Sequence, residues 1–196
     1  MSSKTEIWNM ALANFGGGSI TNTTDTTETA RLLNTKYDNC VRTVLRDFPW
    51  AFARSIKQLR AVTITLPNYN YVYTYPTDCE KILRVCDEGD LEIMPYRNEY
   101  KLFTDGNLQY IASNIENAYI EYTMYVTTTT LYDSAFTKAL SYLLASEVAQ
   151  SATGNNDLSN MMLQKYQLSI AQAKLNSASE DNMPFEFPDS FSRGRR

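Results

Sequence analysis

The chain has 196 residues, of which 43% are hydrophobic and 12% aromatic, and its net charge is −4. This length suits one domain with a large insertion or two small domains, and the hydrophobic content is sufficient for a core. The acidic balance argues against a protein that coats duplex DNA, which needs a basic surface, but it allows DNA to pass nearby. The sequence contains no histidine, which excludes Ser/His and Cys/His nucleophile systems and leaves carboxylate-only chemistry as the open enzymatic route.

The three cysteines, Cys40, Cys79 and Cys86, do not have the spacing of a zinc site. Reduced thiols in a protein that folds in the cytoplasm are the simpler interpretation. The N-terminal residues lack the pattern of a signal peptide, and no apolar run reaches membrane-spanning length. We therefore expect no metal, no cofactor and no membrane partner.

The first helix is expected to begin at a capping box formed by Ser3 and Glu6, and to end at the glycines of residues 16–18. A polar loop follows, in which Asp25 and Glu28 repeat the same spacing of a cap and an acid. A second helix is expected next, with one apolar face recurring every three or four residues: Ala30, Leu33, Tyr37, Val41, Val44 and Phe48.

An aromatic turn follows the second helix, where Pro49 is succeeded by Trp50 and Phe52. Pro49 ends the helix, and the two aromatic side chains are expected to cover the end of the bundle as a structural plug. A ligand-stacking or nucleic-acid-binding turn is the weaker interpretation, because few basic residues are interleaved with the rings.

Residues 60–130 predict an antiparallel sheet with one face exposed to solvent. Asp105 and Gly106 separate two apolar runs, which is a strong hairpin signal. Residues 118–126 then alternate between an apolar face and a second face that carries Tyr119 and Tyr125. These two tyrosines are a candidate contact face for a fibre or another partner.

One group of acidic residues lies in and after a predicted strand: Glu80, Asp87, Glu88, Asp90 and Glu92. A glycosidase needs two acids that face a cleft, and an EF-hand needs a complete series of oxygen ligands. Neither pattern is present, so we expect a solvated loop here.

The helical period returns in residues 131–180, with two apolar series separated by a short turn. The series are Phe136, Leu140, Leu143, Leu144 and Val148, then Leu158, Met162, Tyr166, Ile170 and Ala173. Two helices joined by a short turn are expected to pack antiparallel.

The last segment, residues 181–196, lacks any period and is expected to extend and dock on another subunit. Its candidate contact residues are Phe185, Phe187, Phe191, Arg193, Arg195 and Arg196.

The chain order therefore predicts an α+β fold with four parts. Residues 1–59 and 131–180 form a bundle of about four helices, residues 60–130 form an inserted antiparallel β-domain, and residues 181–196 form an extended docking tail.

Several residues of the first sixty share a pattern: Ala30-Arg31, Tyr37, Arg42, Leu45 and the run PWAFA at residues 49–53, after the short helix in MALANFGGGSI. This pattern resembles the N-terminal signature of head–tail connector proteins, the adaptor or tail tubular protein A-like family of short-tailed bacteriophages. The sequence departs from that family in having NFGGGS where an IG turn is usual.

The resemblance implies a structural virion protein of the neck, without enzymatic activity, assembled in the host cytoplasm. In that family the subunits form a ring, a dodecamer, bound under the portal protein. The C-terminal segment reaches the portal, the opposite face receives the tail nozzle protein, and in some members the β-domain contacts tail fibres. DNA passes through the ring without sequence-specific binding during genome ejection.

Two other functions stay open on the residues alone. One is a cell-wall hydrolase carried by the virion, which would use carboxylates. The other is an adhesin-like or fibre-binding module of the tail, which would use the tyrosine face of the sheet.

Overall fold

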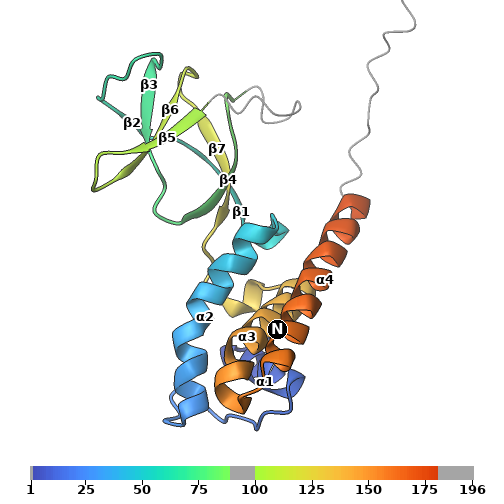
Figure 1. Ribbon diagram of the computed structural model, residues 1–196. Helices are drawn as coiled ribbons and strands as arrows, with labels where there is room; N and C mark the ends of the chain where they lie inside the picture. The colour runs from blue at the N-terminus through green and yellow to red at the C-terminus, as the bar shows by residue number, and fades with distance from the viewer. Residues whose placement is uncertain (1, 89–99, 181–196) are drawn as a thin grey trace, which may run out of the picture.

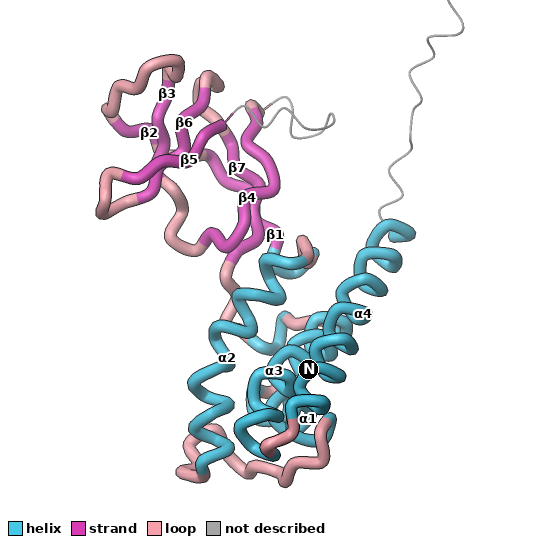
Figure 2. Tube along the Cα trace, in the orientation of Figure 1, coloured by secondary structure: helices cyan, strands magenta, loops and turns pink. Residues whose placement is uncertain are grey.

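The computed structural model describes residues 2–88 and 100–180 and has the predicted α+β architecture, with helices at one end and strands at the other (Figure 1). The helices are α1 (Lys4–Asn14), α2 (Glu28–Asp47), α3 (Ser134–Thr153) and α4 (Asn156–Glu180). The strands are β1 (Arg54–Gln58), β2 (Ala61–Val62), β3 (Tyr71–Thr74), β4 (Cys79–Cys86), β5 (Tyr100–Thr104), β6 (Gln109–Ser113) and β7 (Tyr119–Met124). The expected helical bundle with an inserted antiparallel β-domain is confirmed, and Figure 2 separates the two parts by colour.

Helix α1 begins at the predicted capping box. The Ser3 hydroxyl accepts a hydrogen bond from the amide of Glu6 at 3.2 Å, and the Glu6 carboxylate accepts one from the Ser3 amide at 2.7 Å. These two bonds satisfy amide groups that a helix N-terminus leaves without partners. Gly16 follows the helix with a φ of +77°, which favours glycine.

Helix α2 begins at a different cap from the expected one. Thr27 is the N-cap, and its hydroxyl accepts from the Ala30 amide at 3.2 Å. Asp25 instead accepts hydrogen bonds from the amides of Thr21 and Asn22, at 3.1 and 3.2 Å, so it closes the preceding loop. The expected pairing of Asp25 with Glu28 is therefore wrong, because short polar side chains serve loops and caps equally well.

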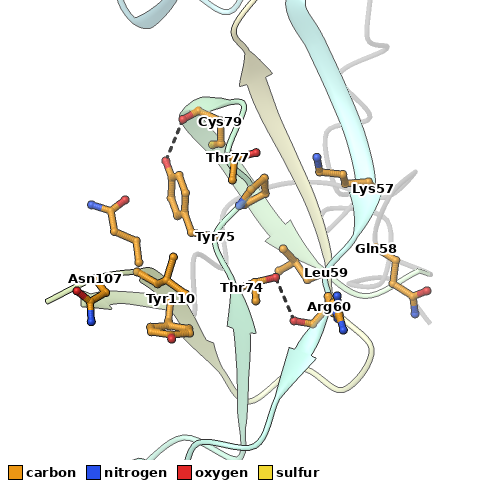
Figure 3. A pocket seen from close by; sticks show the side chains of 13 residues that line it. Lys57, Gln58, Leu59, Arg60, Thr74, Tyr75, Thr77, Cys79, Asn107 and Tyr110 are labelled. Atoms are coloured by element: carbon orange, nitrogen blue, oxygen red, sulfur yellow. Dashed lines mark hydrogen bonds between the residues drawn. The ribbon is translucent and has the colours of Figure 1, made fainter. Parts of the chain in front are cut away.

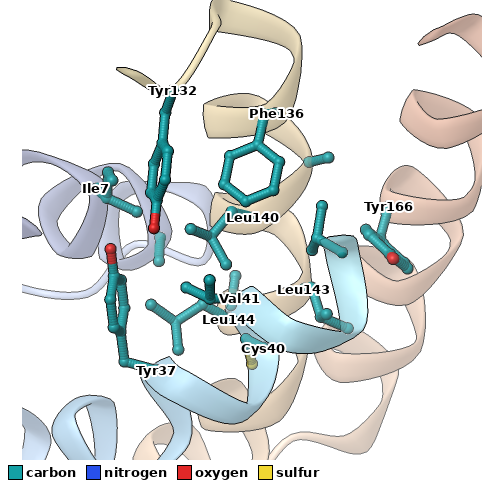
Figure 4. Packing of buried hydrophobic residues seen from close by; sticks show 14 of the residues in the cluster. Ile7, Tyr37, Cys40, Val41, Tyr132, Phe136, Leu140, Leu143, Leu144 and Tyr166 are labelled. Atoms are coloured by element: carbon teal, nitrogen blue, oxygen red, sulfur yellow. The ribbon is translucent and has the colours of Figure 1, made fainter. Parts of the chain in front are cut away.

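The bundle core forms around α3, which packs against α1, α2 and α4. Ile7 of α1, Val41 of α2 and Leu140 and Leu144 of α3 face one another in this core (Figure 4). Most of the predicted apolar series on α2, α3 and α4 is buried there. Gly154, with a φ of +70°, caps α3 and allows the short turn that returns the chain as α4.

The β-domain contains two sheets rather than one. One has the strand order β1-β7-β4 and the other has β2-β3-β6-β5, with antiparallel pairing throughout the described strands. Their facing side chains form a second core: Leu59, Tyr73, Val85, Ile111, Ala118, Ile120 and Tyr122. The hairpin predicted at Asp105 and Gly106 is confirmed as the connection between β5 and β6.

Two expectations about the β-domain are wrong. The strands begin at Arg54 rather than after residue 59, because β1 pairs with β7 from Arg54–Thr123 to Gln58–Tyr119. The second face of β7 is also not open to solvent, since Glu121 is 7% exposed and Thr123 is 1% exposed. The end of α2 packs near this face, and arginine side chains complete the cover.

Candidate functional site: the junction between the bundle and the β-domain

A short aromatic turn connects α2 to β1. Phe48 leaves the helix in an extended conformation, as expected for a residue that precedes a proline such as Pro49. Trp50 is 2% exposed, and its indole Nε1 donates a hydrogen bond to the carbonyl oxygen of Val44 at 2.8 Å. The indole is thereby attached to the last turn of α2, which fixes the direction in which the chain leaves the helix.

The rings of this turn pack against the start of α3. The centroid of Phe136 lies 5.2 Å from that of Trp50 and 5.0 Å from that of Phe52, both in edge-to-face geometry. Phe52 also lies 5.5 Å from Tyr132. Pro49, Trp50 and Phe52 thus lie at the helix-to-sheet turn, and the aromatic plug (residues 49–53) joins α2 to α3 directly before β1 begins.

A buried carboxylate links α2 to β4. Glu80 is 6% exposed, and its side chain accepts a hydrogen bond from the guanidinium of Arg42. Its backbone carbonyl accepts another from Arg46 at 2.7 Å, and Lys81 donates to the Arg46 carbonyl oxygen at 2.9 Å. The expectation that Glu80 belongs to a solvated loop is wrong, because a carboxylate this buried needs the cationic partner that Arg42 supplies.

A second buried carboxylate links the three strands of the first sheet. Glu121 lies on the central strand β7, Arg54 lies on β1 and Arg84 lies on β4. Arg54 Nε lies 3.2 Å from Glu121 Oε1, and Arg84 Nε donates to the other carboxylate oxygen. Arg54 directly follows the aromatic plug, and its ion pair with Glu121 therefore joins the start of β1 to the central strand of the sheet.

The two tyrosines proposed as a partner face lie at opposite ends of β7. Tyr119 pairs with Gln58 at the end far from the bundle, whereas Tyr125 follows the strand and lies under Arg42, with the guanidinium 3.9 Å from the ring centroid. Six residues of extended chain place them on the order of 20 Å apart. The buried side chain of Glu121 lies between them along this face. A partner that used both tyrosines would have to span that distance.

Two core tyrosines next to the junction point their hydroxyl groups toward each other, as Figure 4 shows for Tyr37 and Tyr132. Burial raises the pKa of Tyr132 to about 12 and also raises the pKa of Tyr37, with a further increase from the neighbouring Tyr132. The Tyr132 hydroxyl donates to the carbonyl oxygen of Val126 at 2.8 Å. Both groups are neutral near pH 7, so Tyr37 contributes packing and Tyr132 contributes packing and its hydrogen bond to Val126.

An open cleft of about 730 Å³ lies on the β-domain (Figure 3). Tyr75, Tyr110 and Asn107 lie on one side of it, and Lys57 and Arg60 lie on the other. Aromatic rings beside amide and cationic groups can contact an extended peptide or a sugar. The sequence pattern did not predict this cleft, because its walls come from separate segments that only the fold brings together.

Eight of the candidate residues lie outside the described chain. These are the tail residues Phe185, Phe187, Phe191, Arg193, Arg195 and Arg196, together with Asp90 and Glu92 of the acidic group. Within residues 2–88 and 100–180, no three histidine, cysteine, aspartate or glutamate side chains gather as a metal site. No helix in those same ranges combines the length and apolar character needed to cross a membrane.

Comparison with known proteins gives no assignment. No protein-family model matches the chain, and no curated protein matches it. A function therefore has to be inferred from the residues and their geometry.

Proposed function

We propose that the chain is a subunit of the head-to-tail adaptor ring of a short-tailed bacteriophage. In this role it is a structural protein of the virion that joins the portal to the tail nozzle and lines the channel through which DNA passes. Its partners are further copies of itself in a ring, a dodecamer as in the family it resembles, the portal protein, the nozzle protein and, through the β-domain, a tail fibre.

The observation that carries the proposal is the arrangement at the junction of the residues that match the family pattern. Tyr37 and Leu45 lie in the bundle core, and Trp50 anchors the turn on Val44. Arg42 is the only charged residue of the pattern that reaches the β-domain, where it contacts the Glu80 carboxylate and the ring of Tyr125. A pattern of this kind is expected where the angle between two parts of a subunit has to be the same in every copy.

Closed rings impose that requirement physically. Every copy in a ring makes the same contacts with its neighbours, so a variable angle within the subunit would prevent closure or misplace the outer parts. The aromatic plug fixes the turn out of α2, and the contacts of Arg42 and Arg46 with Glu80 hold the β-domain of this chain at one angle to the bundle. The bundle is then free to form the ring wall while the β-domain contacts other components.

The charge of the chain also suits a DNA channel. A net charge of −4 repels a phosphate backbone and lets it slide, whereas a basic surface would hold it. Both buried carboxylates, Glu80 at the junction and Glu121 in the first sheet, are engaged by arginines. That engagement suits a structural link more than general acid–base chemistry.

The test is to mix the purified chain with the portal ring of the same phage and to image the product by electron microscopy. A matched version that ends at residue 180 separates the role of the tail. We expect a second ring below the portal with the full chain, and a bare portal with the shortened one. A portal that stays bare with the full chain would contradict the proposal.

The cleft on the β-domain favours a second candidate function, an adhesin-like or fibre-binding module of the tail. Its walls offer the rings of Tyr75 and Tyr110 beside polar and cationic groups. The check is a pull-down with the phage's fibre proteins and with host surface glycans. Capture that is lost in Tyr75→Ala and kept when the portal is absent would favour this function over the ring.

A further inference from the structure

Helix α4 has two apolar faces. One of them packs in the bundle core and consists of Met162, Tyr166, Ile170 and Ala173, each at most 7% exposed. The other points outward and consists of Met161, Leu168 and Leu175, which are 41%, 69% and 74% exposed. At 100° per residue, the outward side chains lie on the far side of the helix from the core-facing ones. Single exposed apolar residues are common on folded proteins, but Leu168 and Leu175 are 69% and 74% exposed and lie in one row with Met161. A continuous apolar row of this kind marks an interaction surface.

The outward row has the spacing of a coiled-coil seam. Met161, Leu168 and Leu175 are seven residues apart, so they occupy the same position of three successive heptads. Gln164 and Ala171 fall between them, three residues after Met161 and Leu168, at the second core position of a heptad. Such a seam packs against another helix when one is supplied.

The seam positions from Met161 to Leu175 carry no charge. The outward residues beside the seam are Asn160, Gln167 and Gln172, although a fifth of the chain is charged. Lys165, at the border, has its ammonium group 5.9 Å from the ring centroid of Tyr142 on α3, so it points toward the bundle. Depletion of charged side chains is the compositional mark of the centre of a protein interface.

We propose that this face of α4 pairs with the same face of a second copy of the chain, antiparallel and about a two-fold axis. In this alignment Leu168 lies opposite Ala171 of the second copy, and Leu175 lies opposite Gln164. Large side chains then face smaller ones across the seam, which lets the helices approach closely. The axis repeats each contact, as an isologous interface requires.

The charge pattern favours a second copy over a different partner. A parallel self-pairing would bring each charge beside its own equivalent, whereas the antiparallel one does not. In the antiparallel alignment Lys165 lies opposite Gln172 of the second copy, and Lys174 lies opposite Gln167. Lys174 thus meets an amide, the ammonium group of Lys165 points toward its own bundle, and no like charges face each other across the helix pair.

The pairing is a property of the free chain and does not depend on the adaptor function. Residues 160–175 span about 24 Å of helix, so the contact is smaller than a standard interface and dissociates on dilution. A two-fold contact also closes after two copies, whereas ring contacts are head-to-tail. Failure of this pairing would therefore leave the portal experiment unaffected.

Sedimentation equilibrium of the purified chain over a hundredfold range of concentration tests the pairing. We expect a reversible monomer–dimer equilibrium that Leu168→Lys shifts at least tenfold toward monomer. Leu102→Lys, at an edge-strand leucine that is 48% exposed, is the matched control and should leave the equilibrium unchanged. A chain that is monomeric at every concentration, or a dimer that is equally stable in Leu168→Lys, would overturn the proposal.

Cysteine cross-linking tests the direction of the pairing. Chains carrying Leu168→Cys are mixed with chains carrying Ala171→Cys, both with Cys79→Ser, because Cys79 is the half-buried native thiol. The antiparallel alignment predicts that the mixed disulfide forms at least fivefold more than either homodimer. A dominant Leu168→Cys homodimer would indicate parallel helices, and no cross-link would indicate no pairing; either result overturns the proposal.

Discussion

The sharpest consequence of the junction concerns Trp50. Replacing it with alanine removes an indole that is 2% exposed and lies in edge-to-face contact with Phe48 at 4.8 Å and with Phe136 at 5.2 Å. The same change removes the donor that satisfies the Val44 carbonyl oxygen at 2.8 Å. Because the ring lies between α2 and α3, the space it leaves cannot be filled by one helix moving alone.

The expected loss of stability follows from these contacts. Truncating a buried tryptophan costs about 3–5 kcal/mol through lost transfer energy and the cavity left behind. In a chain of this size each kcal/mol lowers the melting temperature by about 2–4 °C. We therefore expect Trp50→Ala to lower the melting temperature of the bundle by about 6–20 °C.

Thermal unfolding followed by far-ultraviolet circular dichroism measures this change, and two variants serve as controls. Trp50→Phe keeps a ring but loses the N–H donor, so it should cost about 1–2 kcal/mol. Leu131→Ala removes a side chain that is 53% exposed and should change stability by less than about 0.5 kcal/mol. A melting temperature of Trp50→Ala within about 2 °C of the unchanged chain would refute the assignment of Trp50 as a buried anchor.

Two further changes test the polar contacts of the β-domain. A double-mutant cycle of Arg42→Ala and Glu80→Ala, read by urea unfolding, should give a coupling of about 1–2 kcal/mol. The coupling is moderate because the Glu80 side chain is 7% exposed, whereas that of Arg42 is 48% exposed and its charge is screened by solvent. A coupling below about 0.3 kcal/mol would contradict the link. Partial burial alone would raise the pKa of Asp78, but hydrogen bonds from Lys57 and Tyr122 outweigh it and lower this pKa below 3.8. A carboxyl with a lowered pKa stabilises the fold above its unfolded pKa, and this contribution is lost as pH falls through the folded pKa. Asp78→Asn should therefore flatten the loss of stability between about pH 4 and pH 2 in acid unfolding curves, and an unchanged slope would argue against these hydrogen bonds.

The helices of this chain could be predicted from the sequence because their signals are local. A cap and an acid three residues apart define the start of α1, and an apolar side chain every three or four residues defines the buried face of α2. The alternation in residues 118–126 likewise identified Ile120 and Tyr122 as core residues of β7. Each of these patterns is complete within fewer than about twenty residues of chain.

The features that the sequence did not reveal depend on distant partners. Residues 54–58 have no strong strand pattern of their own and form β1 because β7 provides the pairing. Glu80 looks like a solvated acid until α2 brings Arg42 to it, and Glu121 looks like a solvent-facing residue until Arg54 and Arg84 cover it. A charge can be buried only with a partner, and the partner is set by the fold.

The positions of these two glutamates explain how one short turn can hold two parts of the molecule together. Arg42 lies before the aromatic plug and reaches Glu80 on β4, whereas Arg54 lies directly after it and reaches Glu121 on β7. The plug therefore sets the direction in which the chain leaves α2, the Arg42–Glu80 pair opposes rotation about that direction, and the Arg54–Glu121 pair fixes the first residue of β1 to β7. Loss of Trp50 alone should loosen the bundle more than the angle of the β-domain, because the Arg42–Glu80 pair stays in place. Loss of Glu80 should free the angle while leaving the bundle core intact, whereas loss of Glu121 should weaken the first sheet instead.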